Sequence, residues 1–245
     1  MQTKIAVLTD IHGNSAALKA VLSDIESDCE VEHIYCLGDL IAIGHETDEV
    51  LEQLHSRSDM TLVLGNHDEA ILNILEGKEP GSQGEVREHH YWIAKHMNPK
   101  FHSFLSNIPK SITTEINGMK IRFVHYHLDC NGQYLPIDRS PSSAKLDELY
   151  KDEDAEIICF GHHHILHHFK TNNQLFINPG SLGCNHKPIA AYSTLQIRDN
   201  CSINCTFKEV LYDNKKFLLD YCNLQVPAKD SILNFFYGNQ HRILE

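Results

Sequence analysis

The chain has no apolar run long enough to cross a membrane. None of its apolar stretches approaches the roughly 18 residues that a membrane helix needs. The N-terminal segment 1–10, MQTKIAVLTD, also lacks the long apolar core of a signal peptide and is typical of a first β-strand. We therefore expect a cytoplasmic protein that does not associate with membranes.

Paired cysteines and basic residues are scarce as well. None of the eight cysteines forms a CxxC pair, so no thiolate zinc site is indicated, and Cys36 and Cys159 lie in apolar runs typical of buried thiols. Lys and Arg number 21 against 33 Asp and Glu, which gives a formal net charge of −12. Such a surface repels polyanions and argues against stable nucleic-acid binding. It does not exclude small anionic substrates, because bound metal ions can reverse the local charge.

The chain does contain a regular alternation of short apolar runs and helical patterns. Apolar runs at 5–8, 33–37 and 61–64 are separated by helical spacing of apolar residues, which predicts a parallel sheet with helical crossovers. Residues 67–107 have a mostly helical pattern and are expected to form an insert or cap. No linker or repeat divides the chain, so residues 1–245 are expected to form a single domain.

The second half predicts further strands. Asn117-Gly118 lies between two alternating runs, which is typical of a β-hairpin. A helix is expected at 142–151, and two short helical patterns occur in the tail. Four more apolar runs are expected to form a second, mainly antiparallel sheet: 157–160, 175–178, 189–197 and 201–210.

Metal-ligand residue types follow five of the predicted strands at their carboxyl ends. These positions are Asp10-Ile11-His12, Asp39, Asn66-His67-Asp68, His125 and His162-His163-His164. One such residue alone is typical of a turn or a helix cap. Five together, at the sheet edge where ligands bind, predict a divalent metal site.

The same motifs resemble a known family. DIHGN (10–14), GDL (38–40), GNHD (65–68), His125 and GHHH (161–164) are similar to those of the calcineurin-like metallophosphoesterases. The resemblance extends from Lys4 to about Asp213, and DIHGNSAALKAVL and INPGSLG are similar to the branch of small bacterial and archaeal phosphodiesterases. It implies an α/β fold (α+β by some schemes), a four-layer α-β-β-α sandwich of two mixed sheets.

The resemblance also implies two divalent transition metal ions and their ligands. Mn, Fe, Zn or Ni would fit this ligand set, with Mn or Fe favoured. Asp39 would bridge the two ions. The first would be held by Asp10, His12, Asp39 and His164, and the second by Asp39, Asn66, His125 and His162. His127 is an alternative to His125, because the family usually has glycine after this histidine and here Tyr126 and His127 follow.

The histidine tract 162–168 contains five histidines. If residues 162–164 are extended, His162 and His164 share one side of the chain and His163 points away, so only the outer two would reach a metal. His167 and His168 fall in the next predicted strand, where one is expected to face solvent and the other to pack.

The activity implied is hydrolysis of a phosphodiester or nucleotide polyphosphate bond by a bridging hydroxide. His67 would protonate the leaving group, although Ala42 stands where phosphoprotein phosphatases carry an acidic residue that supports this histidine. Asp68 or a backbone group would have to orient His67 instead. Asn14 would either contact the phosphate or only cap the first helix. Ser181 is expected to be a turn residue near the site.

The expected substrate is a small phosphorylated molecule, with nucleotides among the candidates, and a homo-oligomer is compatible with the sequence. Specificity is expected from the segments 67–107 and 127–141, through His89, His90, Tyr91, His96, Tyr134 and Arg139. The alternatives are a phosphomonoesterase, a nuclease or a non-enzymatic scaffold of the same fold. A nuclease would usually have a basic surface, and scaffolds have lost catalytic residues that this chain retains.

Overall fold

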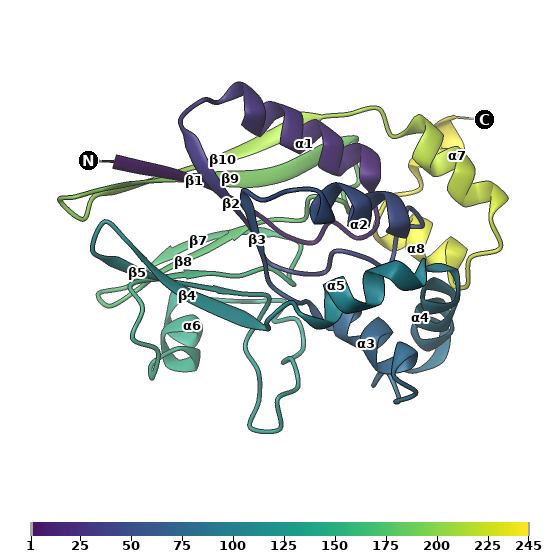
Figure 1. Ribbon diagram of the computed structural model, residues 1–245, viewed down its shortest axis with the longest axis horizontal. Helices are drawn as coiled ribbons and strands as arrows, with labels where there is room; N and C mark the ends of the chain where they lie inside the picture. The colour runs from purple at the N-terminus through teal and green to yellow at the C-terminus, as the bar shows by residue number, and fades with distance from the viewer. Residues whose placement is uncertain (1, 245) are drawn as a thin grey trace.

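Two five-stranded sheets pack face to face in the computed structural model, which describes residues 2–244 (Figure 1). The first sheet has the order β10-β9-β1-β2-β3: β1 (Gln2–Leu8), β2 (Val31–Cys36), β3 (Met60–Leu62), β9 (Ile189–Arg198) and β10 (Ile203–Leu211). The second has the order β4-β5-β6-β8-β7: β4 (Ser111–Ile116), β5 (Met119–Val124), β6 (Ile157–Cys159), β7 (Leu166–Lys170) and β8 (Leu175–Pro179).

The predicted membership of the second sheet was wrong. Strands β9 and β10 return to the first sheet, where β9 runs antiparallel to β1 and pairs Val7 with Ser193. The second sheet is also not mainly antiparallel, since β5, β6 and β8 are parallel and only its edge strands β4 and β7 run the other way. Strand β9 is mostly buried on both faces, a pattern that either sheet could accommodate. Both sheets are therefore mixed.

Helices complete the four layers. Helices α1 (Ser15–Ser27) and α2 (Thr47–His55) cover the outer face of the first sheet, and α6 (Ser143–Leu149) covers that of the second (Figure 1). The predicted insert consists of α3 (Asn66–Leu75), α4 (Gly84–His96), η1 (Pro99–Phe101) and α5 (His102–Ser106). The tail forms α7 (Lys215–Asn223), α8 (Lys229–Phe235) and η2 (Gln240–Ile243), and it meets the insert at one end of the molecule (Figure 1). No helix within residues 2–244 is both long and apolar enough to span a bilayer.

Strand β1 shows how the layers are held together. Its residues alternate between two cores: Ile5 and Val7 pack between the sheets, whereas Ala6 and Leu8 pack under the helices. All four are almost completely buried, as expected for a strand covered on both faces. Cys36 and Cys159 are buried in these two cores, which confirms their predicted environment.

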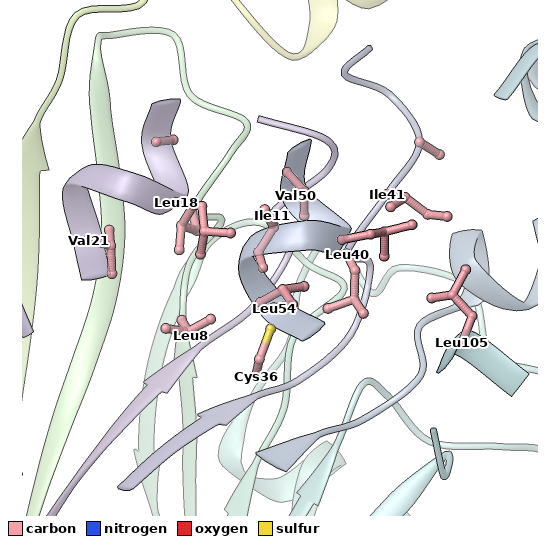
Figure 2. Packing of buried hydrophobic residues seen from close by; sticks show 14 of the residues in the cluster. Leu8, Ile11, Leu18, Val21, Cys36, Leu40, Ile41, Val50, Leu54 and Leu105 are labelled. Carbon is pink, nitrogen blue, oxygen red and sulfur yellow. The ribbon is translucent and has the colours of Figure 1, made fainter. Parts of the chain in front are cut away.

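The helix-covered core also anchors the loops that follow β1 and β2. Ile11 inserts between α1 and α2, close to Leu18 and Val50, whereas Leu40 and Ile41 lie on the other side of α2, toward Leu105 (Figure 2). The three loop residues are completely buried. Because these apolar side chains point into the core, the polar residues beside them in sequence point out of it, over the carboxyl edge of the sheet.

Candidate metal centre

The loops at this edge have an unusual backbone. Five predicted ligand residues adopt the left-handed conformation: Asp10 (φ 54°), His12 (φ 48°), Asp39 (φ 51°), His162 (φ 68°) and His164 (φ 57°). Such angles are uncommon outside glycine and typically mark functional loops held by their surroundings. The extended conformation predicted for residues 162–164 is therefore wrong.

Hydrogen bonds between the loops hold this backbone in place. The amide of Asp10 donates to the Gly38 carbonyl at 3.0 Å, and the amide of His12 donates to the Asp39 carbonyl at 2.9 Å. A Cβ atom on Gly65 would lie 2.1 Å from the Asp39 nitrogen, so only glycine fits beside this carboxylate. The loop after β3 is thus packed directly against the loop after β2.

One group of side chains converges around Asp10. The Nε2 atoms of His12 and His164 lie 2.9 Å apart, and they lie 3.7 and 3.4 Å from Asp10 Oδ1. His12 Nε2 is also 3.7 Å from Asp39 Oδ2. Four predicted ligands from three separate loops therefore meet at one point.

A second group lies on the other side of Asp39. His125 Nε2 is 3.2 Å from Asp39 Oδ2 and 2.9 Å from Asn66 Oδ1. His162 Nδ1 lies 3.2 Å from His125 Nε2. The ligand atoms of Asp39, His125 and His162 lie close enough together to hold one cation, as do those of Asp10, His12 and Asp39. Asp39 belongs to both groups.

The donor set fits divalent transition metals. Asp10 Oδ1 is buried and has no hydrogen-bond partner among the described residues, although two imidazoles face it. A buried carboxylate oxygen without a partner is costly, and a cation shared with the imidazole nitrogens would satisfy it. Carboxylate, imidazole and amide oxygen together suit manganese, iron, zinc or nickel.

The charge states of Asp10 and His12 suit metal binding, whereas His125 would have to lose a proton. Burial by itself would raise the pKa of the Asp10 carboxyl, but neighbouring histidines, first His164, lower it to about 2. Burial lowers the pKa of His12 to about 4, so its imidazole is neutral at pH 7. Burial opposes charge on His125 too, but the Asp39 carboxylate raises the pKa of this imidazole to about 9. His125 therefore carries a proton that a bound cation would displace.

The choice between His125 and His127 follows from their positions. His125 Nδ1 faces the Leu37 carbonyl at 2.8 Å, which leaves Nε2 directed at Asp39 and Asn66. His127 instead packs edge-on against Tyr150, with ring centroids 5.2 Å apart. The structure brings only the first of the two histidines into the cluster.

The remaining histidines of the tract separate as predicted, for a different physical reason. His163 is buried beside Tyr126, 4.6 Å between ring centroids, and so points away from Asp10 and Asp39. The left-handed turns at His162 and His164, and not an extended strand, direct these neighbours to the cluster. In β7 His167 is buried and His168 is exposed, which confirms that one packs and one faces solvent.

His67 lies beside the cluster and is held by the insert. Its amide donates to Asp39 Oδ1 at 2.9 Å, and its ring lies 5.2 Å from that of His12. Its Nδ1 hydrogen-bonds to His90 Nε2 at 2.8 Å, and His90 Nδ1 bonds to the Ser82 hydroxyl, also at 2.8 Å. Burial lowers the pKa of His67, so its ring is neutral at pH 7.

Asp68 does not orient His67, contrary to one of the two predictions. Its carboxylate accepts hydrogen bonds from the amides of Leu40, Ile41 and Gly65 at 2.9 to 3.2 Å. It therefore fixes the loop after Asp39. A backbone group was the other suggestion, but among residues 2–244 the hydrogen-bond partner of the His67 ring is His90. Sequence reasoning had assigned His90 to substrate contact, because the pairing depends on how α4 packs against α3.

Asn14 and Ser181 make structural contacts at the edge of the site. The Asn14 side-chain oxygen accepts from the Ala17 amide, and its nitrogen donates to the Gly183 carbonyl and the Tyr212 hydroxyl. Asn14 is completely buried, so the capping role is confirmed and a phosphate contact stays a prediction without support from these contacts. The Ser181 hydroxyl donates to the Asp10 carbonyl at 3.0 Å, which places this turn residue next to the cluster.

A cleft of about 630 Å³ opens over the cluster, and its walls differ from those predicted. Asp39, His67, His162 and His164 belong to its lining, and most of the rest comes from residues 184–189 and from the end of α8. Of the predicted 127–141 segment only Ile137 contributes. A smaller cavity of about 240 Å³ is lined by the predicted site residues Asn66 and His67 together with His90 and Tyr134, so these two predicted specificity residues do lie beside the candidate site.

The other residues predicted to confer specificity lie elsewhere. His89 is buried and accepts a hydrogen bond from the Ile43 amide, and the exposed His96 packs on Trp92. Tyr91 lies under the Arg87 guanidinium. The polar run Cys184-Asn185-His186-Lys187, directly after INPGSLG, was the overlooked sequence signal for the actual cleft wall.

Comparison with known proteins agrees with this geometry. Residues 3–200 match the model of the calcineurin-like phosphoesterase superfamily domain. The chain is 30% identical over 202 residues to an uncharacterized protein of Methanocaldococcus jannaschii, covering 75% of this chain and 77% of that one. A metallophosphoesterase from Sphaerobacter thermophilus has a similar structure, with a TM-score of 0.72 at 19% identity over 96% of this chain and 98% of that one.

A local match adds a named activity in a relative. Over 72 residues the chain is 39% identical to a symmetrical bis(5′-nucleosyl)-tetraphosphatase of Sodalis glossinidius. The matched segment makes up 29% of this chain and 26% of that protein. The chain thus spans about a quarter of this relative. The family match over most of the chain, the shared fold and the cluster of metal-ligand side chains lead to one conclusion: the chain belongs to the calcineurin-like phosphoesterase superfamily and is a phosphoester hydrolase.

Proposed function

We propose that this protein hydrolyses phosphodiester or nucleotide polyphosphate bonds with a dinuclear metal centre. The observation that carries the proposal is the pair of ligand groups that share Asp39. Asp10, His12 and His164 would complete the first metal site, and Asn66, His125 and His162 the second. Two divalent ions, when bound there, would supply Lewis acidity toward the phosphate and a hydroxide nucleophile at neutral pH.

His67 would supply the proton that the leaving group needs. Its amide is bonded to the shared carboxylate, and its Nδ1 is bonded to His90, so the Nε2 side of the ring is the one available to a substrate. If His90 donates to His67 Nδ1, the proton of His67 resides on Nε2, where it can be given to a departing oxygen. His90 and Ser82 would then set both the orientation and the tautomer of the acid.

A diester or an internal anhydride fits the cleft better than a terminal phosphate. No arginine lies in the five ligand motifs, and Lys187 is the only lysine or arginine in the described lining of the cleft. A dianionic terminal phosphate would have little cationic support beyond the metals. The tetraphosphatase named among the relatives points in the same direction, although it matches only locally.

The same features set the proposal apart from its alternatives. A nuclease would need a basic surface for its polyanion, whereas the net charge here is −12. A scaffold would not need the unpartnered Asp10 carboxylate oxygen or the His67–His90–Ser82 chain of hydrogen bonds. We place the protein in the cytoplasm, acting on small phosphorylated molecules with Mn or Fe as the favoured metals.

The proposal is tested with two nitrophenyl substrates and with metal analysis. In the presence of Mn²⁺, bis-p-nitrophenyl phosphate should be cleaved with a higher kcat/KM than p-nitrophenyl phosphate, and elemental analysis should find up to two metal ions per chain. A kcat/KM roughly tenfold higher for the monoester would make the protein a phosphatase. Absence of hydrolysis of both esters by protein with both metals bound would overturn the proposal altogether.

A further inference from the structure

We infer that the wall of the cleft formed by α8 and residues 184–189 is a binding subsite for a flat aromatic ring, such as a nucleobase, on the group that remains attached to the phosphate. The inference rests on the proposed function, because it assigns the part of the substrate that lies beside the metal centre. Three observations carry it: exposed apolar side chains around the cleft, an aromatic ring next to the ligand histidines, and a rim held rigid by hydrogen bonds.

Apolar side chains from separate parts of the chain meet around the cleft. Ile137 follows β5, Ile165 follows the ligand His164, and Phe235 ends α8, and all three line the cleft. They are 50%, 61% and 70% exposed, although residues of this kind are usually buried. An apolar surface concentrated at the mouth of a catalytic cleft is typical of a binding surface for an apolar group of the ligand.

Phe236 places an aromatic face beside the metal centre. Its ring centroid lies 5.7 Å from that of His164 and 6.5 Å from that of His12. Both histidines belong to the ligand group around Asp10. The phenyl ring is therefore within reach of the ester substituent of a phosphate held there.

Hydrogen bonds join the two sides of the cleft rim, residues 184–189 and the end of α8. The His186 ring nitrogen Nε2 hydrogen-bonds to the Phe235 carbonyl at 2.9 Å, and the Gln240 amide donates to the Asn185 carbonyl at 2.9 Å. Gly238 has φ of 57°, and a Cβ atom there would lie 2.9 Å from the His186 side chain. These contacts hold residues 184–189 against the end of α8, so the aromatic wall exists before a ligand binds.

The polar end of the cleft distinguishes a nucleotide-like group from a lipid. Lys187 is exposed on the rim and forms no ion pair with any of the described residues, in a chain with a net charge of −12. An unpaired cation beside an apolar wall suits a ligand that combines a ring with a second negative group, such as another phosphate. An alkyl chain would leave the exposed Lys187 without a partner.

The test uses diesters that share p-nitrophenolate as the leaving group, so that only the retained group differs. The p-nitrophenyl ester of thymidine 5′-phosphate should be preferred to methyl p-nitrophenyl phosphate. Phe236→Ala should lower kcat/KM roughly tenfold or more for the thymidine ester, as expected for loss of an aromatic stacking partner, and leave the methyl ester within about threefold. Lys187→Ala should lower kcat/KM further only when the thymidine carries a 3′-phosphate.

The controls separate this inference from the proposed function. Ile243→Ala removes an apolar side chain that is 85% exposed and lies outside the cleft lining. This variant should leave kcat/KM unchanged for both the thymidine and the methyl ester. Phe235→Ala, at an exposed position, replaces Phe236→Ala if the latter does not fold, and should give the same selective loss. Free thymidine should also inhibit hydrolysis of the methyl ester by the wild type more strongly than hydrolysis by either phenylalanine variant.

Two results would overturn the subsite. An equal loss on thymidine and methyl esters would mean that the phenylalanines only support His12 and His164, and preference for octyl p-nitrophenyl phosphate would assign the wall to an alkyl chain. Either result leaves the phosphodiesterase proposal intact, because the esters are still hydrolysed. Failure of metal-loaded wild-type protein to hydrolyse any of these diesters would instead overturn the proposed function, and the subsite with it.

Discussion

Replacement of His90 by alanine tests whether α4 orients His67, the proposed acid. His90 is 3% exposed and contacts neither Asp10 nor Asp39, but it hydrogen-bonds to His67 Nδ1 at 2.8 Å and to Ser82 at 2.8 Å. His90→Ala should therefore keep the metals and lower kcat. The alanine removes the hydrogen-bond partner of the His67 ring and leaves room for that ring to turn.

The expected size of the effect follows from the hydrogen bond. Leaving a buried polar nitrogen without a partner costs about 1–3 kcal/mol, and each 1.4 kcal/mol corresponds to about a factor of ten in rate. Without His90, the His67 ring either leaves its Nδ1 without a partner or turns away from the substrate. In the second case the fraction of protein with a correctly oriented His67 falls by the factor that corresponds to this cost. We expect kcat to fall roughly 10- to 100-fold for a substrate with an alkoxide leaving group.

The assay compares leaving groups at saturating substrate. The loss in His90→Ala should shrink to a few-fold when p-nitrophenolate leaves, because this anion needs no proton. His90→Gln should recover part of the activity, since its amide can still donate to His67. His96→Ala is the matched control on the same helix, because His96 is exposed and contacts Trp92, one turn away, and not His67.

One outcome would refute the reasoning. If His90→Ala retains full metal content and its kcat for the alkoxide substrate stays within about twofold of the wild type, His90 does not position His67. A loss of equal size for all leaving groups would show that His90 supports the fold of the cleft and not the acid. Nitrogen NMR of ¹⁵N-histidine-labelled protein should show a change in the His67 tautomer in His90→Ala, which a purely structural role would not cause.

Three further predictions concern the cluster itself. Asp39→Asn should lose both metals in elemental analysis, because Asp39 lies in both ligand groups, and full occupancy would contradict a bridging role. His164→Ala should lose one metal and most activity, whereas His163→Ala should change neither, since its ring packs on Tyr126; the opposite pattern would contradict the positions of these rings. His67→Ala should retain the metals and lower kcat by about 10²–10⁴, and an equal loss for good and poor leaving groups would indicate a binding role.

The parallel part of the first sheet and the candidate ligands at its edge were accessible from sequence because their signals are local. Each ligand directly follows an apolar strand, and the apolar Ile11 between Asp10 and His12 reveals which neighbours face out of the core. The carboxyl ends of parallel strands meet at one edge whatever the details of packing. The Asn117-Gly118 hairpin was equally local, and β4 and β5 form as predicted.

The backbone conformation of the histidine tract was less accessible. The prediction that His163 points away was right, but it relied on an extended chain, and the structure has left-handed residues on both sides of it. Such angles are imposed on non-glycine residues by contacts elsewhere, here the bond from the His162 amide to the Asp10 carboxylate at 3.1 Å. A local pattern cannot contain information about a partner that lies in another loop.

The sequence by itself therefore determined the candidate ligand positions and most secondary structure, because those depend on the residues immediately around them. Only the tertiary structure decided which sheet β9 and β10 join, which residue holds His67, and which side chains form the cleft. Each of these depends on how elements distant in sequence pack. The local sequence of an apolar strand or of a buried histidine is compatible with several packing partners. The residues of the candidate site are thus encoded locally, whereas the shape of the cleft over it arises from the packing of distant elements such as α8.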